Sequence, residues 1–171
     1  MPASDQGPLA GRYTLIPRTL IFLTCGDRVL LLKGAAHKRL WANRYNGIGG
    51  HIERGEGVLE AARRELREEA GLEAPRLALR GVVTVDTGTQ TGIGIFVLRG
   101  EVPETQPAAS DEGTPDWVSR ADLARLPLVE DLPVLLERLL TMKPNDPPFS
   151  AHYAYNEDQK LMIYFDQTSF Q

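Results

Sequence analysis

The alternation of apolar and polar residues along the chain predicts a protein rich in β-strands. Apolar, β-branched or leucine-rich runs favour strands, and short breaks containing glycine, asparagine or aspartate favour turns between them. Breaks of this kind occur at residues 25–27, 87–89 and 156–158, so each is expected to join the two strands of a hairpin. The expected strands are residues 13–24, 28–33, 76–86 and 92–102, followed by a C-terminal β-hairpin over residues 149–166.

Three other segments have the composition and spacing of helices. Residues 57–70 contain good helix formers throughout, and Gly71 stands where a left-handed C-terminal cap is wanted. Residues 120–125 and 130–142 also have helical spacing, and the proline-rich segment that starts at Lys143 ends the second of them. This mixture of strands and helices predicts the α/β (α+β) class.

Carboxylates lie beside the apolar face of the helix expected over residues 57–70. At about 100° per residue, one stripe of this helix is apolar and is expected to face the core. The stripe consists of Val58, Leu59, Ala62, Leu66 and Ala70. Glu65, Glu68 and Glu69 occupy the adjoining arc. An acidic run of this kind is often a solvated face with i to i+4 ion pairs. Acids next to apolar surface, however, repel one another unless a cation such as Mg²⁺ or Mn²⁺ lies among them.

Length, composition and charge fit one globular domain over residues 1–171. A chain of 171 residues can bury one sizeable core and is short for two domains with a linker. The net charge of −4 argues against binding long nucleic acids through their phosphates. The single cysteine, Cys25, fits a reducing compartment. Apolar runs of signal-peptide or membrane-spanning length are absent from the sequence. We therefore expect a cytoplasmic monomer or homodimer, with residues 1–12 flexible.

Residues 50–72, GHIERGEGVLEAARRELREEAGL, match the Nudix box at every defining position. The family pattern is G-x5-E-x7-R-E-U-x-E-E-x-G-U, where U is aliphatic. Here it is satisfied by Gly50, Glu56, Arg64, Glu65, Leu66, Glu68, Glu69, Gly71 and Leu72. Fixed residues at fixed spacing are far more specific than a short glycine motif. The chain therefore resembles the Nudix hydrolases.

The resemblance implies a Nudix fold, in which a mixed β-sheet lies between helices, and an Mg²⁺-dependent enzyme that hydrolyses a phosphate anhydride. Mn²⁺ is a second candidate cofactor. The implied metal ligands are the carbonyl of Gly49 and the carboxylates of Glu65, Glu68 and Glu69. The positions with an implied structural role are Gly50, Glu56, Arg64 and Gly71, and the Glu56–Arg64 pair is expected to brace the loop. Metal ions would offset charge on the phosphate oxygens and lower the pKa of the attacking water.

The residue that accepts the proton from this water varies among similar enzymes. Glu69 is our first candidate for the general base, and Glu68 belongs to the same catalytic group. Glu112 is the second candidate, as a base or as a further metal ligand. It lies in Ser110-Asp111-Glu112 before the strand of Trp117, where similar nucleotide hydrolases supply a carboxylate from outside the box. An ordinary loop acid is the alternative for Glu112.

Over most of its length the chain resembles the MutT-type branch, which hydrolyses oxidised purine nucleoside triphosphates such as 8-oxo-dGTP to the monophosphate and pyrophosphate. In that branch, residues at the positions of Asn46, Glu130 and Asp131 hydrogen-bond the edge of the base. Lys33 is a further candidate for binding this small nucleotide substrate. Alternatively, Asn46 only caps a turn and the acid pair only complements the start of the next helix.

The flanks of the box depart from that branch in two places. Leu128-Val129 stands where the animal form has an aromatic residue that stacks on the base. The loop before Asn46 is longer, and its Trp41 is expected at a core or rim position or against a ligand. Other substrates of the same box therefore stay open: ADP-ribose, diadenosine polyphosphates, coenzyme A and RNA 5′-triphosphates. The intact box argues against a non-enzymatic regulator built on this fold.

Overall fold

The computed structural model of the chain describes residue 7 and residues 11–74 and 76–166. The expected flexibility of residues 1–12 falls almost entirely outside this range. The strands are β1 (Thr14–Cys25), β2 (Arg28–Gly34), β3 (Tyr45–Asn46), β4 (Ala78–Val85), β5 (Thr91–Glu101), β6 (Gly113–Ser119), β7 (Phe149–Tyr155) and β8 (Leu161–Phe165). The helices are α1 (Val58–Ala70), the 3-10 helix η2 (Arg120–Arg125) and α2 (Leu132–Thr141).

The strands form one mixed sheet in the order β3-β2-β1-β5-β4-β7-β8, with β6 paired to β2. Two pairs, β1–β5 and β4–β7, are parallel, and the other neighbours are antiparallel. The expected strands and the C-terminal hairpin β7–β8 are confirmed. The parallel pairs join segments far apart in the sequence, for which local patterning contains no signal.

The expected hairpin of β1 and β2 is present only at its turn. The two strands pair at Thr24–Val29 and Cys25–Arg28 and then diverge. The segment Gly47–Gly50 fills the space that opens beside β1. Its neighbour in β1 is Ile21, which exchanges backbone hydrogen bonds of 2.7 and 3.2 Å with Ile48. The glycine segment is therefore held at the centre of the sheet.

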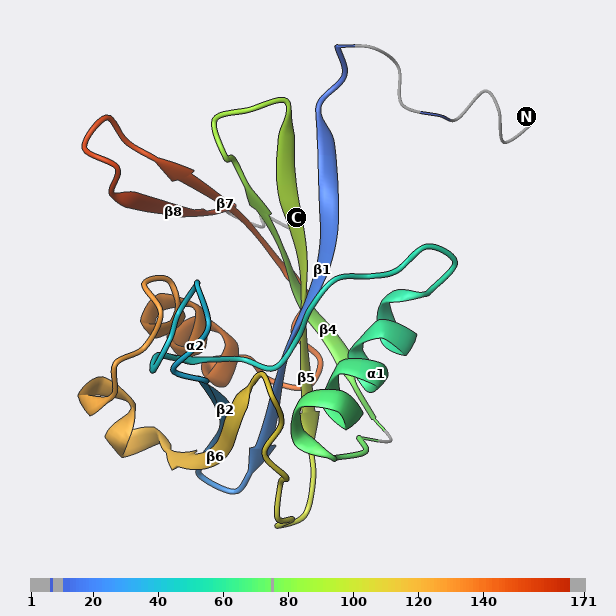
Figure 1. Ribbon diagram of the computed structural model, residues 1–171, viewed down its shortest axis with the longest axis vertical. Helices are drawn as coiled ribbons and strands as arrows, with labels where there is room; N and C mark the ends of the chain where they lie inside the picture. Colours follow the sequence, from blue (N-terminus) through green and yellow to red (C-terminus); the bar gives the residue numbers. More distant parts are fainter. Residues whose placement is uncertain (1–6, 8–10, 75, 167–171) are drawn as a thin grey trace.

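The two α-helices cover opposite faces of this sheet (Figure 1). Successive side chains of β1 alternate between the faces, so Ile21 and Leu23 pack in the cluster of α1 while Phe22 packs in the cluster of α2. The predicted mixed sheet between helices is confirmed. Among the helices of the described residues, none is long and apolar enough to cross a membrane.

Helix α1 begins and ends almost where the sequence predicts. Gly71 adopts the left-handed conformation at φ 63°, and its amide donates to the carbonyl of Arg67 at 3.0 Å. The expected apolar stripe is wrong at Leu59, which is 41% exposed. The buried face is instead turned toward Glu65 and Glu69, and this rotation brings both carboxylates against the sheet.

Candidate functional site

Two glutamates of α1 are buried against the glycine segment. Glu65 is 8% exposed and Glu69 is 6% exposed. The amide of Gly49 donates to Glu69 Oε2 at 3.1 Å. A Cβ atom on Gly50 would lie 2.4 Å from Glu65 Oε1, so only glycine leaves room for that carboxylate in its present place. The loop and the helix thus meet through the residues that the box pattern singles out.

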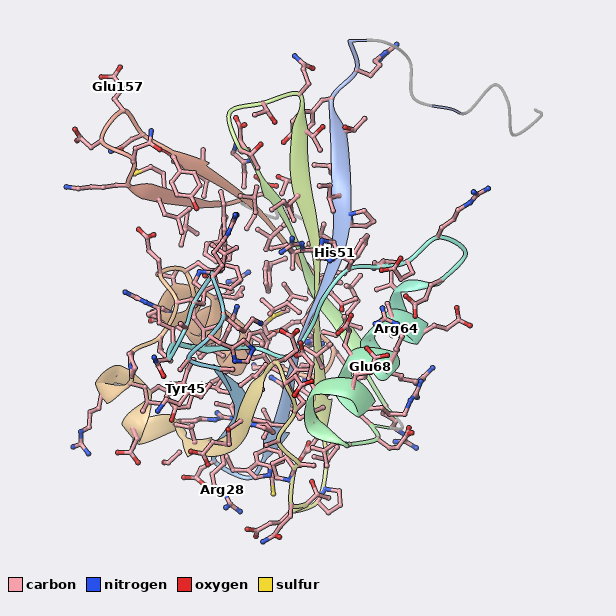
Figure 2. All side chains as sticks on the ribbon, in the orientation of Figure 1. Arg28, Tyr45, His51, Arg64, Glu68 and Glu157 are labelled. Carbon is pink, nitrogen blue, oxygen red and sulfur yellow. The ribbon has the colours of Figure 1, made fainter. Side chains whose placement is uncertain are left out.

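Arg64 connects this helix to the loop before it (Figure 2). Its guanidinium donates to both carboxylate oxygens of Glu56, at 2.9 and 3.0 Å, and to the carbonyl of His51 at 2.9 Å. Nη1 also donates to Glu65 at 2.8 Å and to Glu68 at 3.0 Å. The bidentate contact lowers the pKa of Glu56, and these carboxylates raise the pKa of Arg64. The expected contact between Glu56 and Arg64 is therefore present.

The environment of Glu69 favours the protonated carboxyl. Burial is the largest cause, and the charges of Glu65 and Glu112 add to it, so the pKa of Glu69 is raised to about 7. The Gly49 amide and the charge of Lys38 act in the opposite direction. A buried acid next to other acids is a position where a cation would be stabilised.

The acids of the site do not converge on one point. Among the described residues, no group of three or more His, Cys, Asp or Glu side chains is arranged to hold a metal ion. The reason is that Glu65 and Glu68 turn to Arg64, while Glu112 turns to Lys38. The structure brings Glu65 and Glu69 together, while Arg64 pairs with Glu68 and Lys38 pairs with Glu112 close to Glu69.

The donor set nevertheless fits a divalent metal ion. Glu65 and Glu69 present buried oxygen atoms, and hard cations prefer carboxylate and carbonyl oxygens. The carbonyl of Gly50 accepts from the amide of Thr19 at 2.9 Å, whereas the carbonyl of Gly49 accepts no hydrogen bond from the described residues. Gly49 can therefore supply a carbonyl oxygen beside the two acids.

A lysine that the sequence analysis did not select also acts on Glu69. Lys38 forms an ion pair with Glu112 and lines a cavity of about 60 Å³ that also contains Glu69. Lys33 lies over the ring of Tyr45, at 6.0 Å from its centre, and lines neither this cavity nor the larger one beside it. The long loop between β2 and β3 therefore places Lys38, rather than Lys33, in the site.

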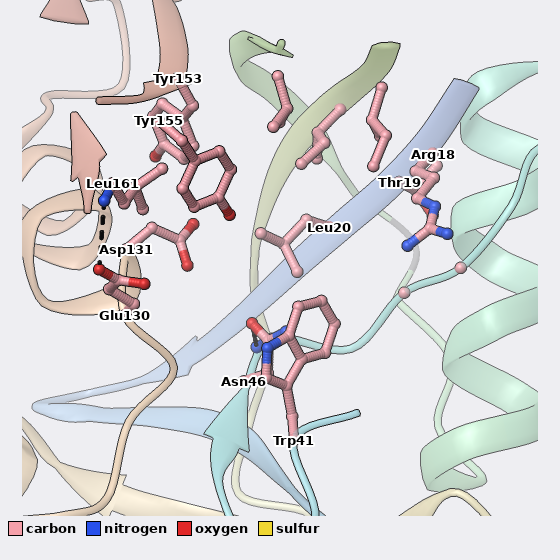
Figure 3. Close-up of a pocket in the computed structure, with 16 residues that line it drawn as sticks. Arg18, Thr19, Leu20, Trp41, Asn46, Glu130, Asp131, Tyr153, Tyr155 and Leu161 are labelled. Carbon is pink, nitrogen blue, oxygen red and sulfur yellow. Dashed lines mark hydrogen bonds between the residues drawn. The ribbon is translucent and has the colours of Figure 1, made fainter. Parts of the chain in front are cut away.

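A larger cavity of about 210 Å³ lies on the α2 side of the glycine segment. Strand β1, the loop between β2 and β3, the start of α2 and the hairpin β7–β8 all contribute to its wall (Figure 3). The two cavities share Trp41, Asn46, Gly47 and Gly49. The two cavities therefore adjoin, with Glu69 at one end and the start of α2 at the other.

Asp131 extends into this cavity from the start of α2 (Figure 3). It is the N-cap residue of α2, but its side chain makes no capping hydrogen bond. Burial, and secondly the charge of Glu130, raise the pKa of Asp131. Glu130 is exposed, and its carboxylate accepts a long hydrogen bond of 3.4 Å from the amide of Leu161. Capping therefore does not account for Asp131.

Asn46 lies across the cavity from Asp131 (Figure 3). Its Oδ1 accepts from the amide of Gly47 at 2.8 Å, as expected for a residue in a turn. Its side-chain nitrogen makes no hydrogen bond within the described residues, and the residue lines the cavity. Both readings of Asn46, turn residue and ligand contact, are compatible with this geometry.

The aromatic residues of the cavity come from unexpected places. Leu128 and Val129 are 9% and 2% exposed and belong to the core around α2. Trp41 is 48% exposed and lines both cavities. Its φ of 59° is uncommon for a bulky residue. In the sequence, the place of Trp41 in a polar loop was the indication of an aromatic contact with a ligand. Tyr153 reaches the cavity because β7 pairs in parallel with β4.

The family model that matches the chain is that of the NUDIX domain, over residues 14–139. The chain is 34% identical over 110 residues to an oxidized purine nucleoside triphosphate hydrolase from Danio rerio, covering 64% of this chain and 67% of that protein. It is 26% identical over 147 residues to the protein of the same name from Mus musculus, covering 85% of this chain and 90% of the mouse protein.

Solved structures with the same fold include a MutT protein and a NUDIX domain bound to ADP ribose. A MutT protein from Bacillus halodurans superposes with a TM-score of 0.74 at 23% identity, covering 89% of this chain and 98% of that one. The NUDIX domain of NrtR from Shewanella oneidensis, solved with ADP ribose, superposes with a TM-score of 0.66 at 15% identity, covering 81% and 96%. At these identities the likeness establishes the fold.

Proposed function

Because the chain belongs to the NUDIX domain family, we propose that it hydrolyses oxidised purine nucleoside triphosphates such as 8-oxo-dGTP to the monophosphate and pyrophosphate. The observation that carries this proposal is the pair of adjoining cavities, one containing Glu69 and the other Asp131. Such a shape suits a phosphate chain joined to a base. The names of the relatives from Danio rerio and Mus musculus support the same substrate class.

The buried acids of α1 would perform the hydrolysis. Glu65, Glu68 and Glu69, with the carbonyl of Gly49, would hold Mg²⁺ or Mn²⁺, which supplies positive charge for the phosphate oxygens and acidifies water. Glu69 would accept the proton of the attacking water, because it is the buried carboxylate held beside the Gly49 amide at the centre of the site. Glu112 is the alternative base and is held near Glu69 by Lys38.

The opposite end of the site would recognise the base. The amide of Asn46 can donate to it or accept from it, and a protonated Asp131 can donate where an ionised one can only accept. The raised pKa of Asp131 favours the protonated form. The half-exposed ring of Trp41 provides an aromatic surface for packing against a purine, where Leu128 and Val129 are buried in the core.

A substrate comparison tests this function. The purified protein is incubated with 8-oxo-dGTP, dGTP or ADP-ribose and Mg²⁺, and the released products are identified. We expect the highest kcat/KM for 8-oxo-dGTP, release of pyrophosphate, and no turnover in excess chelator. A preference for ADP-ribose, or release of orthophosphate, would contradict the proposal, and full activity in chelator would exclude the metal mechanism.

A further inference from the structure

Tyr153 of β7 contains a buried hydroxyl group that the protein itself leaves without a partner. The residue is 2% exposed. Its hydroxyl oxygen is buried and makes no hydrogen bond with the described residues. Burying a polar group without a hydrogen bond is unfavourable. A phenylalanine would fill the same space without this cost, so packing alone does not explain a tyrosine here.

The position of this side chain is fixed by its neighbours on both sides. Tyr153 pairs with Val85 of β4 and with Ile163 of β8. Its carbonyl accepts from the amide of Asp86 at 2.8 Å. A side chain held between two strands in this way offers its hydroxyl group at a defined point, with little conformational freedom to lose on binding.

This side chain forms part of the wall of the larger cavity, next to the acid at the start of α2. Tyr153 and Asp131 both line the cavity (Figure 3). Burial, followed by the charge of Asp131, raises the pKa of Tyr153, which keeps the phenol protonated and able to donate. A phenol can donate one hydrogen bond and accept another, so it is matched to a ligand edge that carries both kinds of group.

We propose that the hydroxyl of Tyr153 is a specificity-determining contact, which forms a hydrogen bond with the polar edge of a purine base held beside Asp131. This inference rests on the proposed function and adds a residue to it. In the free protein the hydroxyl is buried without a partner among the described residues, and a base with matching polar groups supplies one. A ligand without a base cannot do so.

Tyr153→Phe tests the contact, because it removes one oxygen atom and keeps the ring. Binding of 8-oxo-dGMP, the expected product, is measured by calorimetry for the parent and the variant. We expect the variant to bind it about 5- to 20-fold more weakly, the usual cost of a lost hydrogen bond. The KM for 8-oxo-dGTP should rise by a similar factor while kcat changes less than about threefold.

Two controls separate recognition of the base from a structural effect. Tyr164→Phe removes the hydroxyl of a tyrosine of β8 that is 52% exposed and does not line the cavity, and it should leave binding unchanged. Deoxyribose 5-phosphate, which has no base, should bind the parent and Tyr153→Phe equally. The Tm of Tyr153→Phe should equal or exceed that of the parent, since no hydrogen bond between described residues is lost.

Equal binding of 8-oxo-dGMP by the parent and Tyr153→Phe would overturn the inference. So would a loss that is just as large for deoxyribose 5-phosphate, or a fall in Tm that accounts for weaker binding. In each of these cases the parent still hydrolyses 8-oxo-dGTP, and the proposed function stands. A parent that neither binds 8-oxo-dGMP nor hydrolyses 8-oxo-dGTP would refute the proposed function, and this inference with it.

Discussion

At the scale of single residues, burial gives the acids of this chain different properties. Glu68 has a side chain that is 57% exposed, so solvent can stabilise its charge. Glu69 and Asp131 lie in less polar surroundings that raise the pKa of each. Glu69 lies beside the other acids of α1, and Asp131 lines the cavity in which we propose that the base binds. Similar physical causes thus serve two different proposed roles.

The first prediction concerns Glu69, through Glu69→Gln. The amide keeps the size of the side chain but can neither take up a proton nor bind a cation strongly. We expect kcat to fall about a hundredfold or more, with little change in Tm, because the amide avoids placing a charge in a buried site. Glu73→Gln, an exposed acid beside Arg67, is the matched control. Undiminished turnover by Glu69→Gln would exclude this role.

A second prediction uses the pH dependence of stability. The folded pKa of Asp131 is raised from its ordinary value of 3.8, so between the two pKa values the folded state keeps a proton that the unfolded chain has released. The contribution of Asp131 to stability therefore decreases as pH rises through this window and is constant above it. We expect the Tm of Asp131→Asn, relative to the parent, to increase from about pH 4 to pH 8. A Tm difference independent of pH would contradict this.

At the scale of elements, α1 and the loop before it are joined mainly through one arginine. Arg64 contacts Glu56, Glu65, Glu68 and the carbonyl of His51. These contacts connect the loop of His51 and Glu56 to the helix that carries the acids. A single side chain thus determines both the shape of the loop and the direction of two carboxylates.

Arg64→Ala should therefore reduce stability as well as rate. It leaves several carboxylates and a carbonyl without their donor. We expect Tm to fall by about 3–8 °C and kcat to fall as well. Arg67→Ala, on the exposed side of the same helix, should change Tm by less than about 2 °C. If Arg64→Ala melts like the parent, its bracing role is wrong.

The glycines beside α1 allow a paired prediction. The three atoms nearest a Cβ on Gly50 all belong to the carboxylate of Glu65, whereas a Cβ on Gly49 would lie 2.2 Å from the backbone carbonyl oxygen of Thr19. A side-chain end can move, but a backbone strand in the sheet cannot move cheaply. We expect Gly50→Ala to lower kcat with little change in Tm, and Gly49→Ala to lower Tm by about 5 °C or more. Melting curves and initial rates of both variants are the measurements, and equal losses of Tm would contradict the assignment.

At the scale of the whole molecule, the sequence predicted the structural features that depend on residues close together in the chain. The helix of the box, its cap at Gly71, most strands and the Glu56–Arg64 contact depend on residues near one another in the chain. The parallel pairs β1–β5 and β4–β7 do not. Because β7 is positioned by β4, nothing local in the sequence indicated that Tyr153 would meet Asp131.

The same limitation explains why the sequence did not indicate how the lysines lie around the site. Lys33 was selected for substrate binding, but its side chain turns toward Tyr45. Lys38 enters the site through the long loop between β2 and β3, whose course depends on contacts such as the amide of Asn43 donating to the carbonyl of Gly34 at 2.9 Å. Loop geometry of this kind is determined by tertiary contacts and leaves no periodic signal in the sequence.

The last prediction concerns the separate roles of the two cavities, hydrolysis at Glu69 and recognition of the base at Asp131. Glu69 and Asp131 share no hydrogen-bond partner among the described residues, so their effects should be largely independent. Glu69→Gln should lower kcat/KM for 8-oxo-dGTP and dGTP by the same factor, because the anhydride is common to both. Asp131→Asn should cost about 1–3 kcal/mol in kcat/KM for the preferred purine nucleotide and leave the Mg²⁺ concentration for half-maximal activity unchanged.

Asn46→Ala should resemble Asp131→Asn, since both residues line the larger cavity. The double variant Glu69→Gln/Asp131→Asn should show the product of the two single effects, within about a factor of two. The measurements are kcat/KM for 8-oxo-dGTP, dGTP and ADP-ribose, and Mg²⁺ titrations of activity, for the parent and each variant. If Asp131→Asn and Asn46→Ala reduce kcat/KM equally for all three substrates, these residues do not recognise a base. The larger cavity would then serve the fold or the phosphate chain.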